Sequence, residues 1–379
     1  MLLKQWPNGK IKTSGLGFGC MRFKTNEGKV DEELAIRLLQ KAYKKGINYF
    51  DTAIVYLDGQ SEPVLGKAMK PFDRDSFYIA SKYSLWSLTD PAEIDHVIDR
   101  QLANLQTDYI DFYLLHAISK DRLQKIIDLK LIEVVKRWQQ QGKIRYIGFS
   151  FHDDYETFMK MLDLYPWDFC QIQFNYVDKD IQQGMQGYQE LIKRNIPIVV
   201  MEPLKGGSLA KFNETVEAKF KARSSDSMAK WAFRWVSSMP GVKVALSGMN
   251  EESQLDENLA IYQNFKKMTP EEFEFVEAMG QEFKRLEVVG CTKCRYCMPC
   301  PFGVYIPDNF EVINEHMMYK NDRAALWDYG YLESKKGDAS ACMNCQACLE
   351  KCPQHIDIPN RLIDVAKLMK EIRANDHRS

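Results

Sequence analysis

The sequence lacks the features that would place the protein in a membrane, outside the cell or on nucleic acid. No apolar run approaches the roughly 18 residues that a membrane-spanning helix needs. Residues 1–7 have neither the basic start nor the apolar core of a secretory signal. Charge is balanced, with 51 Lys and Arg against 52 Asp and Glu and a net charge of −1. Since no basic stripe is present to neutralise phosphates, we expect a soluble, cytoplasmic protein without membrane or nucleic-acid partners.

The sequence also lacks the pattern of a disulfide-bonded protein, although it contains ten cysteines. Disulfide frameworks are typical of small secreted chains, whereas this chain has 379 residues and places eight of its cysteines in two tight runs. Clustered cysteines in a large chain without a signal indicate metal binding instead. Cys20 and Cys170 lie outside the runs in apolar surroundings, where we expect them to be small buried hydrophobic residues.

The two cysteine runs have the spacing of ferredoxin-type iron–sulfur ligands. The second run matches the bacterial pattern C-x2-C-x2-C-x3-C-P in full, and the first has two residues instead of three before its last cysteine. In that pattern three cysteines bind one cubane and the fourth binds the neighbouring cluster. We therefore predict two [4Fe–4S] clusters with these ligands: Cys291, Cys294, Cys297 and Cys352 for one, and Cys342, Cys345, Cys348 and Cys300 for the other.

Structural zinc is the alternative metal, because it takes four thiolates from paired C-x2-C segments. Zinc accounts for four cysteines but not for two runs of four that each end in Cys-Pro. Segments with helical apolar spacing lie between and after the runs, at 308–319, 322–332 and 360–373. The cysteines therefore indicate an α-helical, two-cluster ferredoxin-like domain over 286–379, which follows a first domain over 1–285.

In the first domain, short β-rich segments alternate with longer segments of helical period. This alternation predicts a parallel sheet covered by helices, and eight repeats of it predict an α/β fold, the (β/α)8 TIM barrel. The expected strands are 16–20, 49–53, 78–82, 111–116, 146–150, 170–175, 196–202 and 244–248. The expected helices include 31–45, 91–106, 129–141, 155–164, 188–194, 227–238 and 270–285.

Polar residues and one glycine stand where seven of these strands would end. The carboxyl ends of the strands form the catalytic face of such a barrel. Charged residues in a buried strand need partners or a function, and several together favour a function over simple strand capping. The residues in question are Asp51, Lys82, His116, Ser150, Gln173, Glu202 and Gly248.

Asp51, Tyr56, Lys82 and His116 suit the reduction of a carbonyl group. The reaction needs a hydride on carbon and a proton on oxygen, and an ordinary tyrosine with a pKa of about 10 is a poor proton donor at neutral pH. A cation at Lys82 would lower that pKa, and Asp51 would keep Lys82 ionised. His116 would orient or polarise the carbonyl. Tyr56 is then the general acid.

The segments that carry these residues resemble the active-site segments of the aldo-keto reductase superfamily. They are DTAIVY at 51–56, IASK at 79–82 and DFYLLH at 111–116, and the resemblance continues through the barrel, for example in GFS at 148–150 and QIQFNY at 171–176. With the cysteine runs added, the chain resembles the iron–sulfur-containing branch of that superfamily. The resemblance implies an NAD(P)H-dependent oxidoreductase that interconverts a small-molecule carbonyl substrate and its alcohol.

The resemblance also implies a nicotinamide dinucleotide bound across the barrel mouth without a glycine-rich Rossmann loop. The expected contacts are Ser150 and Gln173 at the carboxamide, Leu204, Lys205 and Gly206 at the pyrophosphate, and Glu257 and Asn258 at the adenosine. Met201 stands where many members stack an aromatic ring on the nicotinamide. Gly248 and Gln254 stand where NADPH-specific members have basic residues, and Glu251 and Glu252 add like charge nearby. The choice between NADP and NAD is therefore open.

Three functions are compatible with these residues. The first is an NAD(P)H-dependent oxidoreductase whose clusters exchange electrons with a redox partner. A nicotinamide passes two electrons as hydride whereas a cubane passes one, so direct coupling would need a flavin or radical step. The second function is therefore a flavin-containing electron-transfer reductase, with FMN at the phosphate site of the barrel. The third is a cofactor-sensing or partner-binding barrel with structural clusters, because fold alone does not assign activity.

Two aromatic residues, Tyr83 and Trp86, follow directly after Lys82. They are either an aromatic wall for the substrate or ordinary packing of the loop.

Overall fold

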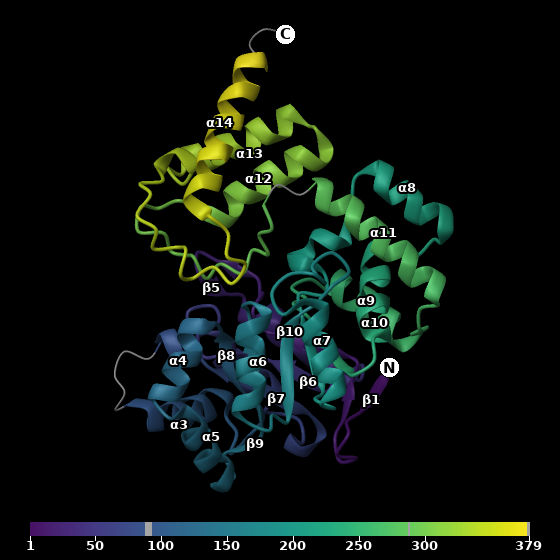
Figure 1. The fold of residues 1–379 in the computed structure, drawn as a ribbon, viewed down its shortest axis with the longest axis vertical. Coiled ribbons are helices and arrows are strands. Elements are labelled where there is room, and N and C mark those ends of the chain that lie inside the picture. Colours follow the sequence, from purple (N-terminus) through teal and green to yellow (C-terminus); the bar gives the residue numbers. More distant parts are fainter. Residues whose placement is uncertain (88–92, 287–288, 377–379) are drawn as a thin grey trace. The chain divides into compact units, whose positions relative to one another are not determined.

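The computed structural model of the chain describes residues 1–87, 93–286 and 289–376 (Figure 1). The chain forms two compact units, and each is described by itself. The first joins Met1–Pro203 to Lys230–Pro270, and the second joins Leu204–Ala229 to Glu271–Ser379. The second unit thus includes a segment from the middle of the chain, and the boundary expected at 285–286 stays a prediction.

The first unit is a closed barrel of eight parallel strands. Around the barrel the strands follow chain order, and β12 closes onto β3. The predicted (β/α)8 barrel is confirmed, with a strand in each of the eight expected places. The strands are β3 (Leu16–Gly19), β6 (Tyr49–Asp51), β7 (Tyr78–Tyr83), β8 (Ile110–Ile118), β9 (Ile144–Phe151), β10 (Phe169–Gln173), β11 (Ile198–Met201) and β12 (Val242–Ser247).

Amphipathic helices connect and cover these strands. In α1, Asp31 caps the amino end by accepting a hydrogen bond from the N–H of Leu34, and a buried stripe with helical spacing runs along one face. Four further helices coincide with predicted ones, and the start of the helix expected over 91–106 lies outside the described residues. The helices are α1 (Glu32–Lys44), α2 (Ser61–Met69), α3 (Ile94–Leu105), α4 (Lys120–Asp128), α5 (Leu131–Gln140), α6 (Tyr155–Leu164), α7 (Gly184–Lys193), α9 (Met228–Ser238) and α10 (Glu252–Gln263).

A hairpin of β1 (Leu3–Gln5) and β2 (Lys12–Ser14), which the sequence pattern did not predict, precedes the barrel. Trp6 lies in its connection and packs against Phe112 and Phe169, with ring centroids 4.8 and 6.1 Å away. These two side chains come from the first halves of β8 and β10. The hairpin therefore closes the amino-terminal end of the barrel, and the carboxyl-terminal end is left for chemistry.

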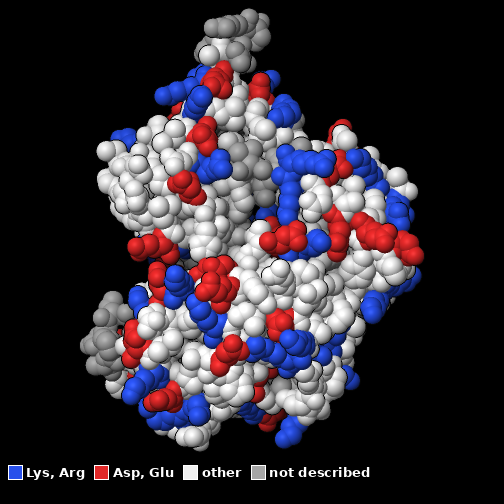
Figure 2. Space-filling model, in the orientation of Figure 1, with Lys and Arg blue, Asp and Glu red and all other residues white. Residues whose placement is uncertain are grey.

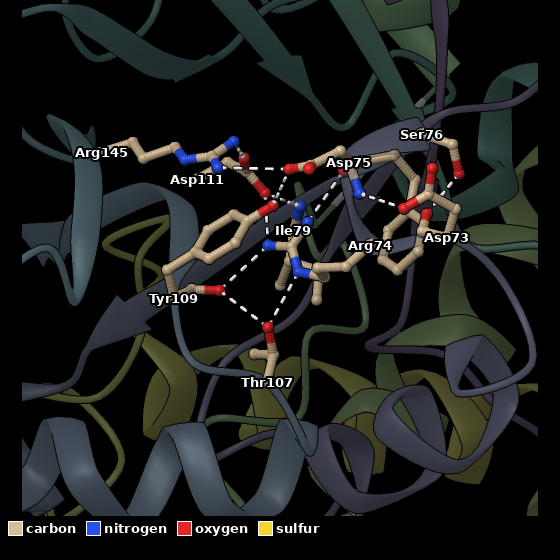
Figure 3. A network of polar contacts seen from close by, with 10 residues as sticks. Asp73, Arg74, Asp75, Ser76, Ile79, Thr107, Tyr109, Asp111 and Arg145 are labelled. Carbon is tan, nitrogen blue, oxygen red and sulfur yellow. Dashed lines mark hydrogen bonds and ion pairs between the residues drawn. The ribbon is translucent and has the colours of Figure 1, made fainter.

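A buried carboxylate at the start of β8 fixes the amino-terminal side of the barrel wall (Figure 3). Asp111 is fully buried and pairs with Arg74 at 2.6 Å and Arg145 at 3.1 Å. The ring of Tyr109 lies against both guanidinium groups. Burial raises the pKa of Asp111, and the Arg74 charge acts in the opposite direction. The two arginines thus hold a charge that the barrel would otherwise exclude.

The second unit is built from helices, as the sequence predicts for the cysteine-rich region. Helices α12, α13 and α14 pack on one another around an apolar core that includes Phe310, Tyr329 and Leu362. Six of the eight clustered cysteines have intermediate burial and pack against this core: Cys291, Cys297, Cys300, Cys342, Cys348 and Cys352. The helices of the unit are α8 (Glu214–Arg223), α11 (Pro270–Leu286), α12 (Ile306–Tyr319), α13 (Asp322–Ser334) and α14 (Ile358–Asp376).

Charge of both signs is interspersed over the face shown in Figure 2, in keeping with the net charge of −1. Among the described residues, no helix combines the length and the apolar character needed to cross a bilayer.

The Asp111 network predicts a specific loss of stability. Asp111→Asn removes the charge between Arg74 and Arg145 while keeping the shape of the side chain, so we expect the free energy of unfolding to fall by about 2–4 kcal/mol. Asp99→Asn is the matched control, because the Asp99–Lys143 pair is largely exposed and should contribute below about 1 kcal/mol. Denaturant unfolding monitored by far-UV circular dichroism measures both, and equal losses would contradict the prediction.

Candidate functional site

Four polar side chains converge at the carboxyl ends of three neighbouring strands. Asp51 ends β6, Tyr56 lies in the segment that follows, Lys82 is in β7 and His116 is in β8. All four are buried, with Tyr56 the most exposed at 7%. Because β6, β7 and β8 are adjacent in the barrel, the structure brings together the four residues predicted from the sequence.

The ammonium group of Lys82 is the centre of this arrangement. Its Nζ donates to Asp51 Oδ1 and to the carbonyl oxygen of Thr52, both at 2.6 Å. The same nitrogen lies 4.8 Å from the centre of the Tyr56 ring. Burial lowers the pKa of Lys82, while the Asp51 carboxylate acts to raise it. The pair therefore keeps a desolvated cation beside the tyrosine.

His116 also lies next to Tyr56. The two ring centroids are 5.7 Å apart and nearly perpendicular. Burial lowers the pKa of His116 well below its usual value, and the charges of Lys82 and Arg122 act in the same direction. The imidazole is therefore neutral at pH 7, and its Nδ1 is hydrogen-bonded to Ser84 Oγ at 2.6 Å. A carbonyl oxygen placed between Tyr56 and His116 would meet two polar groups.

Sequence reasoning missed the residues that support Lys82 and His116. Ser84 lies two residues after Lys82, and the two-residue period of a strand could have placed it on the same face. Glu62 is fully buried and accepts hydrogen bonds from Ser81 at 2.6 Å and Gln101 at 2.8 Å. No spacing in the sequence connects a residue of α2 with one of α3, so this network is visible only in the fold.

The two aromatic residues after Lys82 have different roles. The ring of Trp86 lies 4.7 Å from the His116 ring, at the candidate site. Tyr83 is buried against Trp138 of α5. Of the two alternatives for these side chains, the aromatic wall fits Trp86 and ordinary packing fits Tyr83.

The predicted nicotinamide contacts lie at the ends of β9, β10 and β11. Ser150 Oγ accepts a hydrogen bond from the N–H of Ala117 at 2.7 Å. The Gln173 amide donates to Asp178 at 3.1 Å. Met201 is partly buried against the barrel interior, and Gln171 donates to its sulfur at 3.7 Å. These side chains are in place at the barrel mouth, but their binding of a cofactor stays a prediction.

The predicted adenosine side of the site contains an arginine that the sequence did not single out. Gly248 follows β12, and a Cβ atom there would lie 3.0 Å from the side chain of Arg22. Arg22 in turn pairs with Glu202 at 3.1 Å. The carbon chain of an arginine from the segment after β3 thus lies against the position where NADPH-specific members carry a basic residue.

One of the two acidic residues near this position is less repulsive than the sequence suggested. Glu252 pairs with Arg37 at 3.1 Å and Lys41 at 3.4 Å, so its charge is compensated. On α10, Asn258 is buried and donates to Ser247, whereas Gln254 and Glu257 are exposed.

The predicted pyrophosphate residues Leu204, Lys205 and Gly206 belong to the second unit. Gly206 has φ 66°, and a Cβ atom there would overlap the carbonyl oxygen of Thr292. Thr292 is buried and lies between the first two cysteines of the first run. The glycine therefore permits close packing of the 204–210 loop on a cysteine-bearing segment, whatever its contact with a cofactor.

The cysteines of the second unit gather in two groups. Cys300, Cys342, Cys345 and Cys348 line one small cavity, so the last cysteine of the first run meets three of the second. Cys297 lies within electrostatic reach of Cys291, Cys294 and Cys352, whose charges add to the effect of burial in raising its pKa. This grouping suits two cubanes held by thiolates from both runs.

Comparison with known proteins agrees with both units. Residues 15–281 match the aldo/keto reductase family, and residues 290–356 match the 4Fe-4S dicluster domain. L-Galactose dehydrogenase of Arabidopsis thaliana is 25% identical over 307 residues, covering 75% of this chain and 96% of the plant protein. The aldo-keto reductase YhdN of Bacillus subtilis is 28% identical over 287 residues, covering 65% of this chain and 84% of its own.

Solved structures share the barrel. The holo form of aldo-keto reductase AKR11C1 from Bacillus halodurans has a TM-score of 0.62 at 25% identity, covering 74% of this chain and 96% of its own. An aldo-keto reductase from Klebsiella pneumoniae in complex with NADPH has a TM-score of 0.61 at 22% identity, covering 74% of this chain and 95% of its own.

The close approach of Gly206 to Thr292 predicts different effects for two adjacent glycines. Gly206→Ala forces the loop and the cysteine segment apart, so we expect fewer irons per chain after purification and a free energy of unfolding lower by about 1–3 kcal/mol. Gly207 also has a positive φ, 103°, but no atom of the described residues lies within 4 Å of its Cβ position. Gly207→Ala should therefore keep its iron. Iron analysis with thermal unfolding tests both, and equal iron loss would contradict the packing argument.

Proposed function

Since the chain belongs to the aldo/keto reductase family, a family of oxidoreductases, we propose that it reduces a small-molecule carbonyl with NAD(P)H or oxidises the corresponding alcohol. The observation that carries the proposal is the buried Lys82 ammonium, held by Asp51 at 2.6 Å and lying 4.8 Å from the Tyr56 ring. Proton transfer from a tyrosine needs such a cation at neutral pH. The neutral imidazole of His116 completes the place where the carbonyl oxygen would bind.

The proposed reaction divides its work between cofactor and protein. A nicotinamide dinucleotide, when bound, would supply the hydride for the carbonyl carbon. Tyr56 donates its hydroxyl proton to the carbonyl oxygen, and Lys82 stabilises the negative charge that this leaves on the phenol. Asp51 keeps Lys82 ionised in a site that burial would otherwise neutralise. His116 holds the carbonyl oxygen, and Ser84 fixes the orientation of its ring. In alcohol oxidation the same groups work in reverse.

The cofactor that we propose is a nicotinamide dinucleotide, with Ser150, Gln173 and Asn258 among its contacts. Support for NADP(H) comes from the Klebsiella relative, which was solved with NADPH, and from Arg22 at the position of Gly248. An arginine can pair with a phosphate group, so the glycine at 248 does not by itself argue for NAD. Titration with NADH and NADPH distinguishes the two.

For the second unit we propose two [4Fe–4S] clusters that exchange single electrons with a redox partner. Each of the two groups of cysteines contains residues from both runs, which supports this proposal. One-electron exchange at the clusters does not require them to take part in the hydride step. The two chemistries can therefore operate in one chain as separate activities.

Removal of the Tyr56 hydroxyl tests the proposed proton transfer. We expect Tyr56→Phe to lower kcat for carbonyl reduction by at least about 100-fold, because general acid catalysis contributes that much or more. Dinucleotide binding, followed by fluorescence titration, should be retained. Tyr83→Phe is the matched control, since Tyr83 packs on Trp138 away from the site, and its kcat should stay within about twofold. Unchanged turnover in Tyr56→Phe would rule out this mechanism.

Metal analysis of anaerobically purified protein tests the cluster assignment. We expect roughly eight irons per chain and a brown, oxygen-sensitive absorbance. Cys297→Ser and Cys300→Ser should each lose one cluster and keep the other, giving distinct electron paramagnetic resonance spectra after reduction. Cys170→Ser, at a buried position in β10, should keep its full iron content. Zinc in place of iron, or a flavin spectrum, would require a different assignment.

A further inference from the structure

The cationic side chain of Arg122 contacts Trp86, an aromatic residue of the candidate site. The guanidinium of Arg122, in α4, lies 4.5 Å from the centre of the Trp86 ring. The same ring lies 4.7 Å from the His116 ring. Trp86 is therefore in contact with both the proposed carbonyl-binding histidine and the arginine, and it is partly exposed at 38%.

The position of Arg122 is fixed by the segment that follows His116. Its Nη1 donates to the carbonyl oxygen of Ala117 at 2.5 Å. Ala117 has φ 50°, a conformation that a residue with a side chain rarely adopts, and its N–H donates to Ser150. Strained backbone held by hydrogen bonds on both sides is typical of functional sites. The arginine is thus placed by the same short segment that carries His116.

A guanidinium over an aromatic ring is held there by the attraction of the cation to the ring. Its planar fork carries five N–H donors, of which Arg122 uses one at Nη1 for Ala117. Such a fork matches the two oxygens of a carboxylate. The charge of Arg122 also reaches His116, because it contributes to the lowered pKa of that residue. An anionic group near Trp86 would therefore be attracted to the site.

We propose that Arg122, which lies over the Trp86 ring, binds a carboxylate group of the substrate, so that the preferred substrates are carbonyl compounds that carry a carboxylate several atoms from the carbonyl. This inference rests on the proposed carbonyl chemistry at Tyr56 and His116. It names the substrate class that the same site takes. Trp86 is the wall along which the substrate lies, with its carbonyl end at His116 and its anionic end at Arg122.

Two aldehydes of matched shape test the inference on the full-length, cluster-containing protein. We expect wild-type kcat/KM to be higher for 4-carboxybenzaldehyde than for 4-methylbenzaldehyde. Arg122→Gln should lower this ratio by roughly 10- to 100-fold, because a charge-assisted hydrogen-bonded pair is lost. Arg122→Lys should lie between the two, since it keeps the charge but not the planar fork.

Lys125→Gln is the control for a general charge effect. It removes one positive charge from the exposed side of the same helix, and the ratio should stay within about twofold of wild type. A second measurement needs no variant: benzoate should inhibit reduction of 4-methylbenzaldehyde at least about tenfold more strongly than benzamide, its neutral counterpart.

The outcomes separate this inference from the proposed function. If Arg122→Gln slows both aldehydes equally, or if benzoate and benzamide inhibit alike, Arg122 merely positions the backbone after His116 and the inference is overturned. Failure of the proposed function would appear differently, as no Tyr56-dependent oxidation of NADPH or NADH with either aldehyde.

Discussion

The buried ion pair between Lys82 and Asp51 is the constraint on which the candidate site depends. A buried ammonium group is costly unless it is paired and hydrogen-bonded, and Lys82 has both the Asp51 carboxylate and the Thr52 carbonyl within 2.6 Å. The pair exists because β6 and β7 are adjacent and in parallel register, with Asp51 opposite Ala80. The closed barrel supplies that register, and the network of Glu62, Ser81 and Gln101 holds the back of β7. The ion pair that the proposed chemistry needs therefore depends directly on the register of the barrel strands.

Much of the fold followed from the sequence, for identifiable reasons. The eight strands were recognisable because each is a short buried run bounded by helical segments, and the four polar residues were recognisable because they end three successive strands. The hairpin of β1 and β2 was not predicted, because its strands are three residues long and gain their stability from Trp6 packing inside the barrel. Short elements of this kind depend on tertiary contacts rather than on any local pattern.

The residues around the site were harder to predict, because they act across strands that are distant in sequence. Arg22 and Gly248 are 226 positions apart along the printed sequence, yet the arginine side chain occupies the space that the glycine leaves. Position 248 itself carries no basic side chain, and the fold brings one beside it from the segment after β3. Arg122 and Trp86 are a similar case, since only the fold brings the start of α4 onto the segment after β7. The spacing of residues along the sequence does not show that a side chain from one segment takes the place of a side chain missing from another.

The packing of Gly206 on Thr292 bears on how such a two-part protein can change over evolution. A ferredoxin-like cassette joined to a barrel by a flexible linker could be lost or exchanged freely, leaving the enzyme intact. Here the loop after β11 folds with the cysteine segment in one compact unit. Deletion of the ferredoxin-like domain would remove the residues that pack against the loop that follows Met201. Descendants of this protein are therefore expected to keep both parts or to remodel that loop when they discard the cysteines.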